Sequence, residues 1–341
     1  MDFEFLDRLT NYEIEKYIND NTDKIKEIAF YLALSGNLEL IKYLAEEKKL
    51  NLNVKDDKGR TILFDACCSG NIELLKYLIE EKKVNVDIKD KEGQTVLFNA
   101  CVSGNLELVK YLVEEKKLNV NVKDKEGETV LFSLCFIGNL NLTKYLIEEA
   151  KLDVNAKNKS GQTVLFKACY FENIELVKLL IEEGADVNVR DNFGRTVLFG
   201  SAKNEDLELV KYLVEEKKVN VNVKDGSERT ILFDACYSGN LELVEYLTEH
   251  GADIKVKDDF GQTVLFDACE NGNIELVEYL IKHGAEVNVA DKEGKSLLSF
   301  AMENSNKEII DYLKSVGAQE QIKTKKSFFS FLWEDLNKYM N

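Results

Sequence analysis

A threonine followed by two apolar residues recurs along the chain at steps of 33 or 34 residues. A regular period of this length indicates a repeat architecture, in which each unit packs only on its neighbours. No Gly/Ser-rich linker interrupts the series, so the sequence predicts one extended array rather than two ordinary domains. The threonines are Thr61, Thr95, Thr129, Thr163, Thr196, Thr230 and Thr263, with Ser296 as a weaker eighth member.

Each unit carries the pattern of two short helices followed by a loop. In the unit that begins at Thr95, apolar residues spaced along one helical face predict a first helix, with Thr95 as its N-cap and Gly104 as its stop. Leucines and valines at 3–4 spacing over residues 106–113 predict the second helix, and "NVNVKDKEGE" predicts a turn-rich finger. A unit this small cannot exclude water from both helices, so stacking must stabilise it.

Units differ in length by one residue. The 34-residue steps follow units that end "EEKKLNVNVKD", whereas the 33-residue steps follow "EEGADVNVRD" or "EHGADIKVKD". We expect the extra residue to lie in the loop after the second helix, because changes in loop length cost little free energy.

These units closely resemble the ankyrin repeat. The shared pattern is D-x-x-G-x-T-x-L-x-x-A, then G-N-x-E-[LI]-V and, in some units, G-A-D-V-N, over roughly residues 22–318. The resemblance implies an all-α, ankyrin-type helical-repeat solenoid, a right-curved stack in which each unit is a helix-turn-helix plus a finger loop. It also implies that first helices and fingers line a concave face, and that the protein binds other proteins.

Two departures from the family pattern alter the expected packing. The proline and histidine that usually follow the threonine are replaced here by Val or Ile and then by Phe, so we expect a stack of rings where the family has a histidine hydrogen-bond bridge. The finger before Thr230 has Glu228 in place of the finger glycine, with Gly226 nearby, and we expect a differently shaped finger there. The ring column is Phe64, Phe98, Phe132, Phe166, Phe199, Phe233 and Phe266.

The ends of the array differ from its centre. Residues 1–21 are expected to form an N-terminal capping half-repeat, since "NYEIEKYI" matches a second helix with Glu15 where valine is usual. Residues 22–318 form the array. Residues 319–341 carry an amphipathic stripe that either caps the last unit or docks on a partner or a membrane surface.

Charge and composition exclude several classes of function. A net charge of −17 argues against nucleic-acid binding, which needs clustered Lys and Arg. No apolar run approaches the ~20 residues that span a bilayer, and the N-terminus lacks a secretory pattern. His250 and His283 have no nucleophile arranged with them, so we expect no enzyme, no cofactor and no metal site.

The cysteines form one column of the repeat. Stacked helices lie ~8–10 Å apart, whereas a disulfide needs Cα atoms within ~7 Å of each other. We therefore expect buried, reduced thiols and a reducing, cytoplasmic location. The column is Cys67, Cys101, Cys135, Cys169, Cys236 and Cys269, and Cys68 lies outside it.

The two positions after the cysteine column vary from Ser to Phe, as surface positions do. The units that begin at Thr129 and Thr163 place Phe136, Ile137, Tyr170 and Phe171 there, which predicts an apolar contact surface on the concave face. The alternative is local repacking, because Glu172 also replaces the glycine that ends the first helix in other units. The predicted apolar contact residues are Val102, Phe136, Ile137, Tyr170, Phe171, Phe193 and Tyr237.

A basic residue stands six positions before each threonine from Thr61 to Thr263. This basic ladder is Lys55, Lys89, Lys123, Lys157, Arg190, Lys224 and Lys257. We expect Lys123, Lys157 and Arg190 to contact a partner that carries an acidic segment; the alternative is pairing with the aspartates that follow the rungs. A polar column (Asp65, Asn99, Ser133, Lys167, Gly200, Asp234 and Asp267) varies in charge and is a candidate for selecting that partner.

These features favour a monomeric, non-enzymatic interaction module, either a scaffold or an adaptor. One alternative is an inhibitor, such as an immunity protein that masks one toxin or enzyme, which the strong acidity fits. The other is a membrane-associated effector that uses the C-terminal segment.

Overall fold

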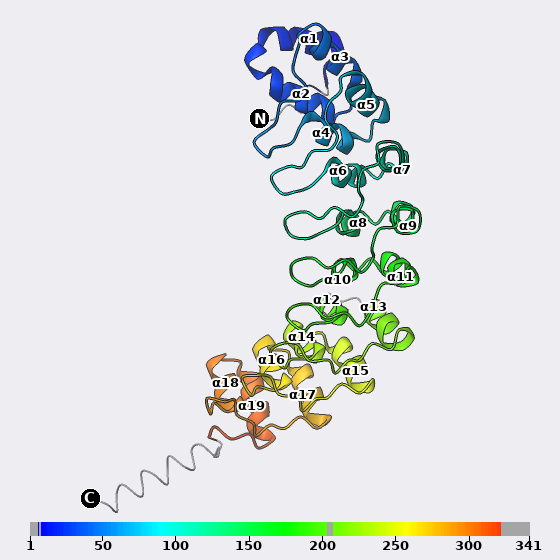
Figure 1. Cartoon of the computed structure of the whole chain (residues 1–341). Helices are drawn as coiled ribbons and strands as arrows, with labels where there is room; N and C mark the ends of the chain where they lie inside the picture. Colours follow the sequence, from blue (N-terminus) through cyan, green and yellow to red (C-terminus); the bar gives the residue numbers. More distant parts are fainter. Residues whose placement is uncertain (1–5, 7, 203–206, 322–341) are drawn as a thin grey trace, which may run out of the picture. The chain divides into compact units, whose positions relative to one another are not determined.

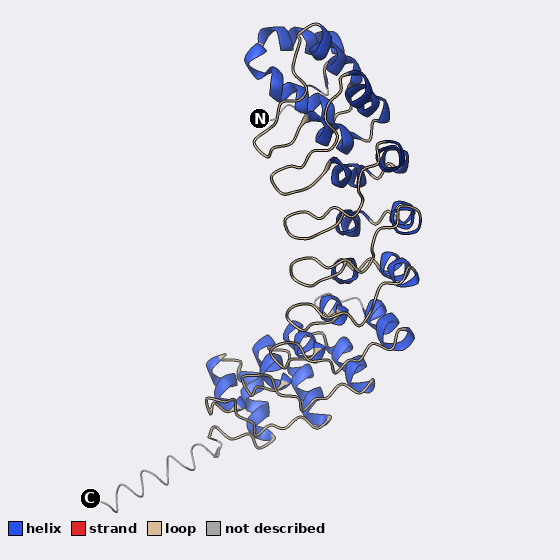
Figure 2. Cartoon of the chain, in the orientation of Figure 1, coloured by secondary structure: helices blue, strands red, loops and turns tan. Residues whose placement is uncertain are grey.

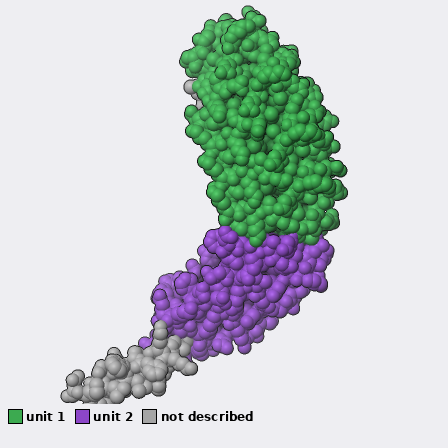
Figure 3. Space-filling view, viewed as in Figure 1, with its two compact units in different colours: residues 1–185 green, residues 186–341 purple. Residues whose placement is uncertain are grey.

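The computed structural model describes residues 6, 8–202 and 207–321. It divides into two compact units, residues 1–185 and 186–341, which are coloured in Figure 3 and called here the N-terminal and C-terminal units. The part of the chain outside the description includes most of the predicted C-terminal segment 319–341, so its two expected roles remain predictions.

In the N-terminal unit, helices form two layers with the fingers extending from one of them (Figure 1). Helix α1 (Asn11–Asp20) and a short 3-10 turn (Thr22–Lys24) precede the first layer. That layer comprises α2 (Ile25–Leu34), α4 (Ile62–Ser69), α6 (Val96–Ser103), α8 (Val130–Ile137) and α10 (Val164–Tyr170). The second layer comprises α3 (Leu38–Glu46), α5 (Ile72–Lys76), α7 (Leu106–Lys110), α9 (Leu140–Glu148) and α11 (Ile174–Glu182).

The C-terminal unit repeats the same pairing. Its first helices are α12 (Val197–Ser201), α14 (Ile231–Ser238), α16 (Val264–Asn271) and α18 (Leu297–Glu303). Its second helices are α13 (Leu207–Lys211), α15 (Leu241–Glu249), α17 (Ile274–Lys282) and α19 (Lys307–Ser315). Figure 2 shows helices and loops only, and within the described ranges the β-structure is limited to isolated bridges such as Lys89 with Thr95. The predicted all-α helical repeat is confirmed.

The core lies between the two layers of helices. Apolar residues from both helices of every pair are buried, because each helix turns one face toward its partner and toward the next unit. The phenylalanine column is buried throughout, and in the last units Phe266 meets Phe300 edge to face at 5.2 Å between ring centroids. Rings thus fill the place where the family pattern has histidine.

An asparagine at the start of several second helices ties neighbouring units together. The Asn105 side-chain oxygen accepts a hydrogen bond from the Leu108 amide at 3.2 Å and caps α7. The same side chain donates to the Gly70 carbonyl of the preceding unit at 2.8 Å. The pair of bonds recurs at Asn71, Asn139, Asn273 and Asn306.

In three of the longer units the extra residue lies at the end of the second helix, and there its expected place in the following loop is wrong. In the longer unit that begins at Thr129, α9 has nine residues like α11, and the extra residue follows the helix as expected. In three units the last turn is a π-helix, Tyr77–Glu81, Tyr111–Glu115 and Tyr212–Glu216. The Lys116 amide, for example, bonds to the Tyr111 carbonyl five residues back. A π-turn accommodates one added residue without breaking the backbone ladder.

The added residue also links units across the second layer. Lys116 donates from Nζ to Glu80 of the preceding unit at 2.7 Å, and the Tyr111 hydroxyl donates to the same carboxylate at 2.9 Å. The Lys116 ammonium lies 4.8 Å from the Tyr111 ring centroid. Burial raises the pKa of Tyr111 to about 12, so its hydroxyl stays protonated and keeps donating at physiological pH.

The repeat threonines occupy the N-cap position, but their side chains do not cap the helix as the sequence predicted. At Thr163 the backbone is extended, the side chain makes no cap hydrogen bond, and the residue is buried. Its Oγ1 has no hydrogen-bond partner, as is also true at Thr61, Thr196, Thr230 and Thr263. The hydroxyl is turned into the packed interior, and with phenylalanine in the histidine position no polar partner meets it.

We expect Thr163→Val to raise the free energy of unfolding by about 1 kcal/mol, because valine keeps the shape of threonine and removes an unpaired buried hydroxyl. Urea titration followed by circular dichroism measures the change. Thr163→Ser is the control: it keeps the hydroxyl, loses the methyl group and should be destabilising by about 1 kcal/mol. A loss of stability in the valine variant would show that the hydroxyl is bonded.

Each finger is closed by the residue that follows the basic ladder, which is an aspartate everywhere except at Asn158. In the third finger, Asp124 Oδ1 accepts from the amides of Glu126 and Glu128, both at 2.9 Å. Adjacent fingers join through their backbones, as when the Lys125 amide donates to the Glu92 carbonyl at 2.7 Å. The fingers therefore form a continuous edge within each unit.

The finger before Thr230 has the same turn as the others, so the expectation of a different shape is wrong. Glu228 adopts φ 62°, the left-handed conformation that glycine has in the other fingers. Its amide donates to the Asp225 carbonyl at 3.2 Å, and Asp225 Oδ1 accepts from the Ser227 and Arg229 amides. The hydrogen bonds of Asp225 hold the turn, and they outweigh the free-energy cost of the left-handed backbone conformation at Glu228.

Candidate interaction surface

An aromatic cluster lies exposed on the N-terminal unit, at the ends of two neighbouring first helices. We define it as Phe136 and Ile137 of α8 with Tyr170 and Phe171 at the end of α10. Phe136 is 82% exposed, and Tyr170 and Phe171 are 49% and 41% exposed. Val102, at the corresponding place on α6, is exposed as well. Rings this open to solvent are not part of a repacked core.

The rings of the cluster hold one another in place. Phe171 meets Phe136 edge to face at 6.0 Å between centroids, and it meets Tyr170 at 5.5 Å in the same geometry. Helix α10 ends at Tyr170, and Glu172 takes the left-handed position at φ 56° that Gly138 occupies after α8. The Glu172 amide still bonds to the Cys169 carbonyl, so the turn survives without glycine.

Two of the predicted apolar contact residues lie in the C-terminal unit. Phe193 is exposed in a finger, where the Arg195 guanidinium covers its ring at 5.0 Å from the centroid. Tyr237 is exposed near the end of α14.

All rungs of the basic ladder are exposed. Lys123 Nζ donates to the Lys157 carbonyl at 2.8 Å, and the Arg190 side chain donates to the carbonyls of Gly194 and Lys224. The adjacent aspartates bond chiefly to their own finger, and Asp56 and Asp191 pair with arginines inside the same turn. The sequence alternative was that each aspartate pairs with the basic residue directly before it. The contacts that these aspartates form differ from that pairing.

The polar column, which was considered for selecting the partner, is buried or half-buried at every member. Burial raises the pKa of Asp65 to about 6 and that of Asp267 to about 7, although an arginine lies beside each carboxylate. Arg229 pairs with Asp267 at 2.7 Å, and Arg60 lies 3.5 Å from Asp65. Asn99 donates to the sulfur of Cys68 at 3.1 Å. These members of the column stabilise the units themselves.

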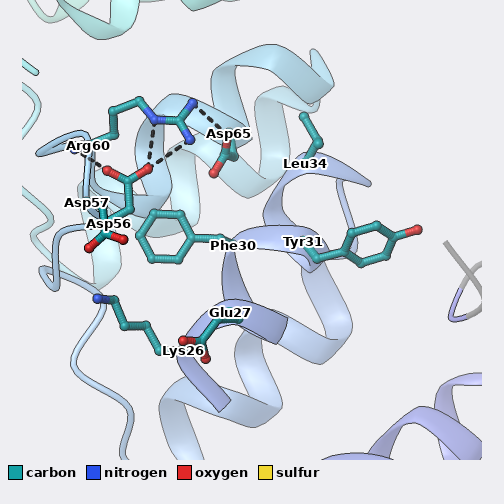
Figure 4. A pocket seen from close by; sticks show the side chains of 9 residues that line it. All are labelled: Lys26, Glu27, Phe30, Tyr31, Leu34, Asp56, Asp57, Arg60 and Asp65. Carbon is teal, nitrogen blue, oxygen red and sulfur yellow. Dashed lines mark hydrogen bonds and ion pairs between the residues drawn. The ribbon is translucent and has the colours of Figure 1, made fainter. Parts of the chain in front are cut away.

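Sequence reasoning missed a pocket of about 360 Å³ between α2 and the first finger. Figure 4 shows Phe30 between the Arg60–Asp56 pair and Lys26, with Leu34 farther along the same helix. Aligning "LALSGN" with "ACCSGN" would have shown that Leu34 shares the position of Val102 and Phe136. No finger precedes α2, which is why Phe30 is only half-buried where its counterpart Phe64 is sealed.

The cysteine and histidine side chains are packed in the core or bonded to the backbone. The column cysteines are buried and unbonded to each other, and burial raises their pKa values, to about 12 at Cys101. His250 and His283 each bond through Nδ1 to a backbone carbonyl at 2.8 Å and pack on a tyrosine ring. Over residues 6, 8–202 and 207–321, no three His, Cys, Asp or Glu side chains gather as a metal site.

The family model for ankyrin repeats, which is three copies long, matches residues 3–90, 28–124, 116–191, 185–258 and 251–324. The chain belongs to the ankyrin repeat family. Ankyrin repeats are generally protein–protein interaction modules and are typically non-enzymatic. No curated protein matches the chain. In the described part of this ankyrin repeat protein, no helix has the length and apolar character needed to cross a bilayer.

Proposed function

We propose that this ankyrin repeat protein is a non-enzymatic scaffold or adaptor that binds a partner protein at the aromatic cluster. The observation that carries the proposal is the exposure of Phe136, Tyr170 and Phe171 in two columns whose residues vary from serine to phenylalanine between units. Exposed apolar patches with aromatic anchors are characteristic of protein-binding surfaces. By its family, the face shared by first helices and fingers is the concave, partner-binding one.

The mechanism is rigid display. The cluster lies on short helices fixed by stacking, by left-handed turns and by edge-to-face contacts between its own rings. Because few side-chain conformations are lost on binding, little of the interaction free energy is spent on ordering the surface. Val102 extends the apolar strip toward the preceding unit. The domain boundaries 1–21, 22–318 and 319–341 and a monomeric state belong to this proposal.

A second candidate is an inhibitor of one toxin or enzyme, which the net charge of −17 favours because it suits a basic target. Affinity purification with the full chain separates the two functions. A scaffold should recover several partners of modest affinity, whereas an inhibitor should recover one partner in equimolar amount whose binding weakens with salt.

Replacing both Tyr170 and Phe171 by alanine should weaken the binding of a recovered partner by about 2 kcal/mol, roughly thirtyfold, because two central anchors are lost. Isothermal titration calorimetry measures the affinity, and thermal melting checks the fold. Tyr12→Ala, which removes an exposed aromatic from the capping helix α1, is the matched control and should leave affinity unchanged. Unchanged affinity together with a sharply lower melting temperature in the double variant would refute the proposal.

A further inference from the structure

We propose that the pocket between α2 and the first finger binds a finger-shaped turn of a partner protein. The bound turn has Asp or Asn as its first residue and Gly as its fourth. The site is separate from the aromatic cluster, so this inference goes beyond the proposed function and does not depend on it.

Neighbouring fingers of the N-terminal unit are joined by one recurring backbone bond. The Lys91 amide of the second finger donates to the Lys58 carbonyl of the first at 2.8 Å. The Lys125 amide of the third finger donates to the Glu92 carbonyl of the second at 2.7 Å. In both pairs the donor is the second residue of its turn, and the acceptor is the third residue of the preceding turn. Each finger thus offers a donor on one side and an acceptor on the other.

The first finger has an unused donor, because no finger precedes it. Its turn runs from Asp56 to Gly59, and the Gly59 amide donates to the Asp56 carbonyl at 2.9 Å. The second residue of this turn is Asp57, whose amide meets no acceptor within residues 6, 8–202 and 207–321. An unpaired backbone donor at the end of a bonded series is a template for one more member.

The pocket has the position of a missing finger. Figure 4 shows Phe30 of α2 and Asp57 of the first finger among the residues that border its volume of about 360 Å³. Phe64, the counterpart of Phe30 in the next unit, follows a finger and is fully buried, whereas Phe30 is half-buried. The neighbouring repeat therefore shows what fits over this ring, and we expect the occupant to be a turn of the same shape.

Contacts between fingers determine the sequence of the bound turn. Its fourth residue must be glycine, because a Cβ at Gly93 would lie 3.2 Å from the Lys125 amide nitrogen. A Cβ at Gly127 would lie 3.1 Å from the amide nitrogen of Lys159 in the same way. The first residue must be Asp or Asn, since its side-chain oxygen closes the turn as Asp124 does. A turn that meets the Asp57 amide as one finger meets the next therefore has the sequence [Asp/Asn]-x-x-Gly.

A library of disulfide-closed random loops displayed on phage, panned on the full chain, tests this site. We expect one family of recovered loops to carry [Asp/Asn]-x-x-Gly. Synthetic loops of this family should bind Asp57→Pro about tenfold more weakly than the natural chain, because proline lacks the amide donor. Asp57→Ala keeps the amide and should change the affinity less than about threefold. The loops should bind the Tyr170→Ala, Phe171→Ala double variant as they bind the natural chain.

Three results would overturn the proposal. One is that no recovered loop carries the turn sequence. Another is that the loops are indifferent to Asp57→Pro, or that Asp57→Ala weakens them equally, since the amide is then not the group that they bind. The third is that the double variant at Tyr170 and Phe171 no longer binds them, which would assign the loops to the aromatic cluster.

Thermal melting shows whether the position beside Asp57 is open. Asp57→Pro should leave the melting temperature unchanged, because the second position of a β-turn accepts proline and the removed amide has no partner. Lys91→Pro removes the equivalent amide where it is bonded, and it should lower the melting temperature by about 3 °C. An equal fall in both variants would show that the chain itself already fills this place, and that result too would overturn the proposal.

Discussion

Replacing Asn105 by alanine is expected to lower the free energy of unfolding by about 3 kcal/mol. The side chain has two tasks, since it caps α7 through the Leu108 amide and donates to the Gly70 carbonyl of the preceding unit. A lost cap costs about 1 kcal/mol, and an acceptor left without its partner costs a further 1–3 kcal/mol, roughly. Equilibrium urea denaturation gives the change.

Asn105→Ser separates the two tasks, because serine caps a helix about as well as asparagine but cannot reach across to Gly70. Asn105→Ser should lower the free energy of unfolding by about 2 kcal/mol. This loss is smaller than that of the alanine variant because serine keeps the helix cap. Equal losses in the serine and alanine variants would mean that the cap contributes nothing here. A loss below 1 kcal/mol in both would mean that the bond between units is not a source of stability.

Gly127→Ala should be as damaging, at about 3 kcal/mol. Gly127 has φ +79°, and a Cβ there would lie 3.1 Å from the Lys159 amide nitrogen of the next finger. That amide donates to the Glu126 carbonyl at 2.8 Å, so the added methyl group strains the turn and pushes apart a bond between fingers. The left-handed backbone accounts for roughly 1–2 kcal/mol and the displaced bond for the rest.

Gly184→Ala is the matched control for this variant. Gly184 has φ +90°, yet no atom lies within 4 Å of a Cβ built there. It therefore bears only the backbone cost, about 1 kcal/mol. Thermal and urea denaturation of both variants test the difference, and equal destabilisation would show that contact between fingers adds nothing to the strain of the turn.

The sequence predicted the repeat because its signals are local and occur many times. Gly104, for instance, ends α6 in the left-handed conformation as expected, and the cysteine column is buried as expected. The exposure of Phe136 and Tyr170 could also be predicted from the sequence, because a position that varies between copies is usually in contact with solvent.

The errors arose at residues whose contacts the repeat pattern does not reveal. The orientation of the Thr163 hydroxyl depends on what the surrounding helices offer it, and no pattern within one unit reveals that. Asp65 was considered for selecting a partner because its column varies in charge, but it is buried and lies 3.5 Å from Arg60. The extra residue Lys116 belongs to the helix because its amide bonds back to the Tyr111 carbonyl. The spacing of the repeats alone does not distinguish this arrangement from a longer loop.

The lysines that follow the π-helical turns, such as Lys116, make the order of the repeats important. Lys116 belongs to a 34-residue unit, but the carboxylate that it binds, Glu80, belongs to the unit before it. Where a 33-residue unit follows instead, His250 stands 3.8 Å from Glu215, and the contact is ionic only when the imidazole is protonated. Recombination that shuffled the copies of this gene would preserve every helix yet exchange permanent ion pairs for proton-dependent ones.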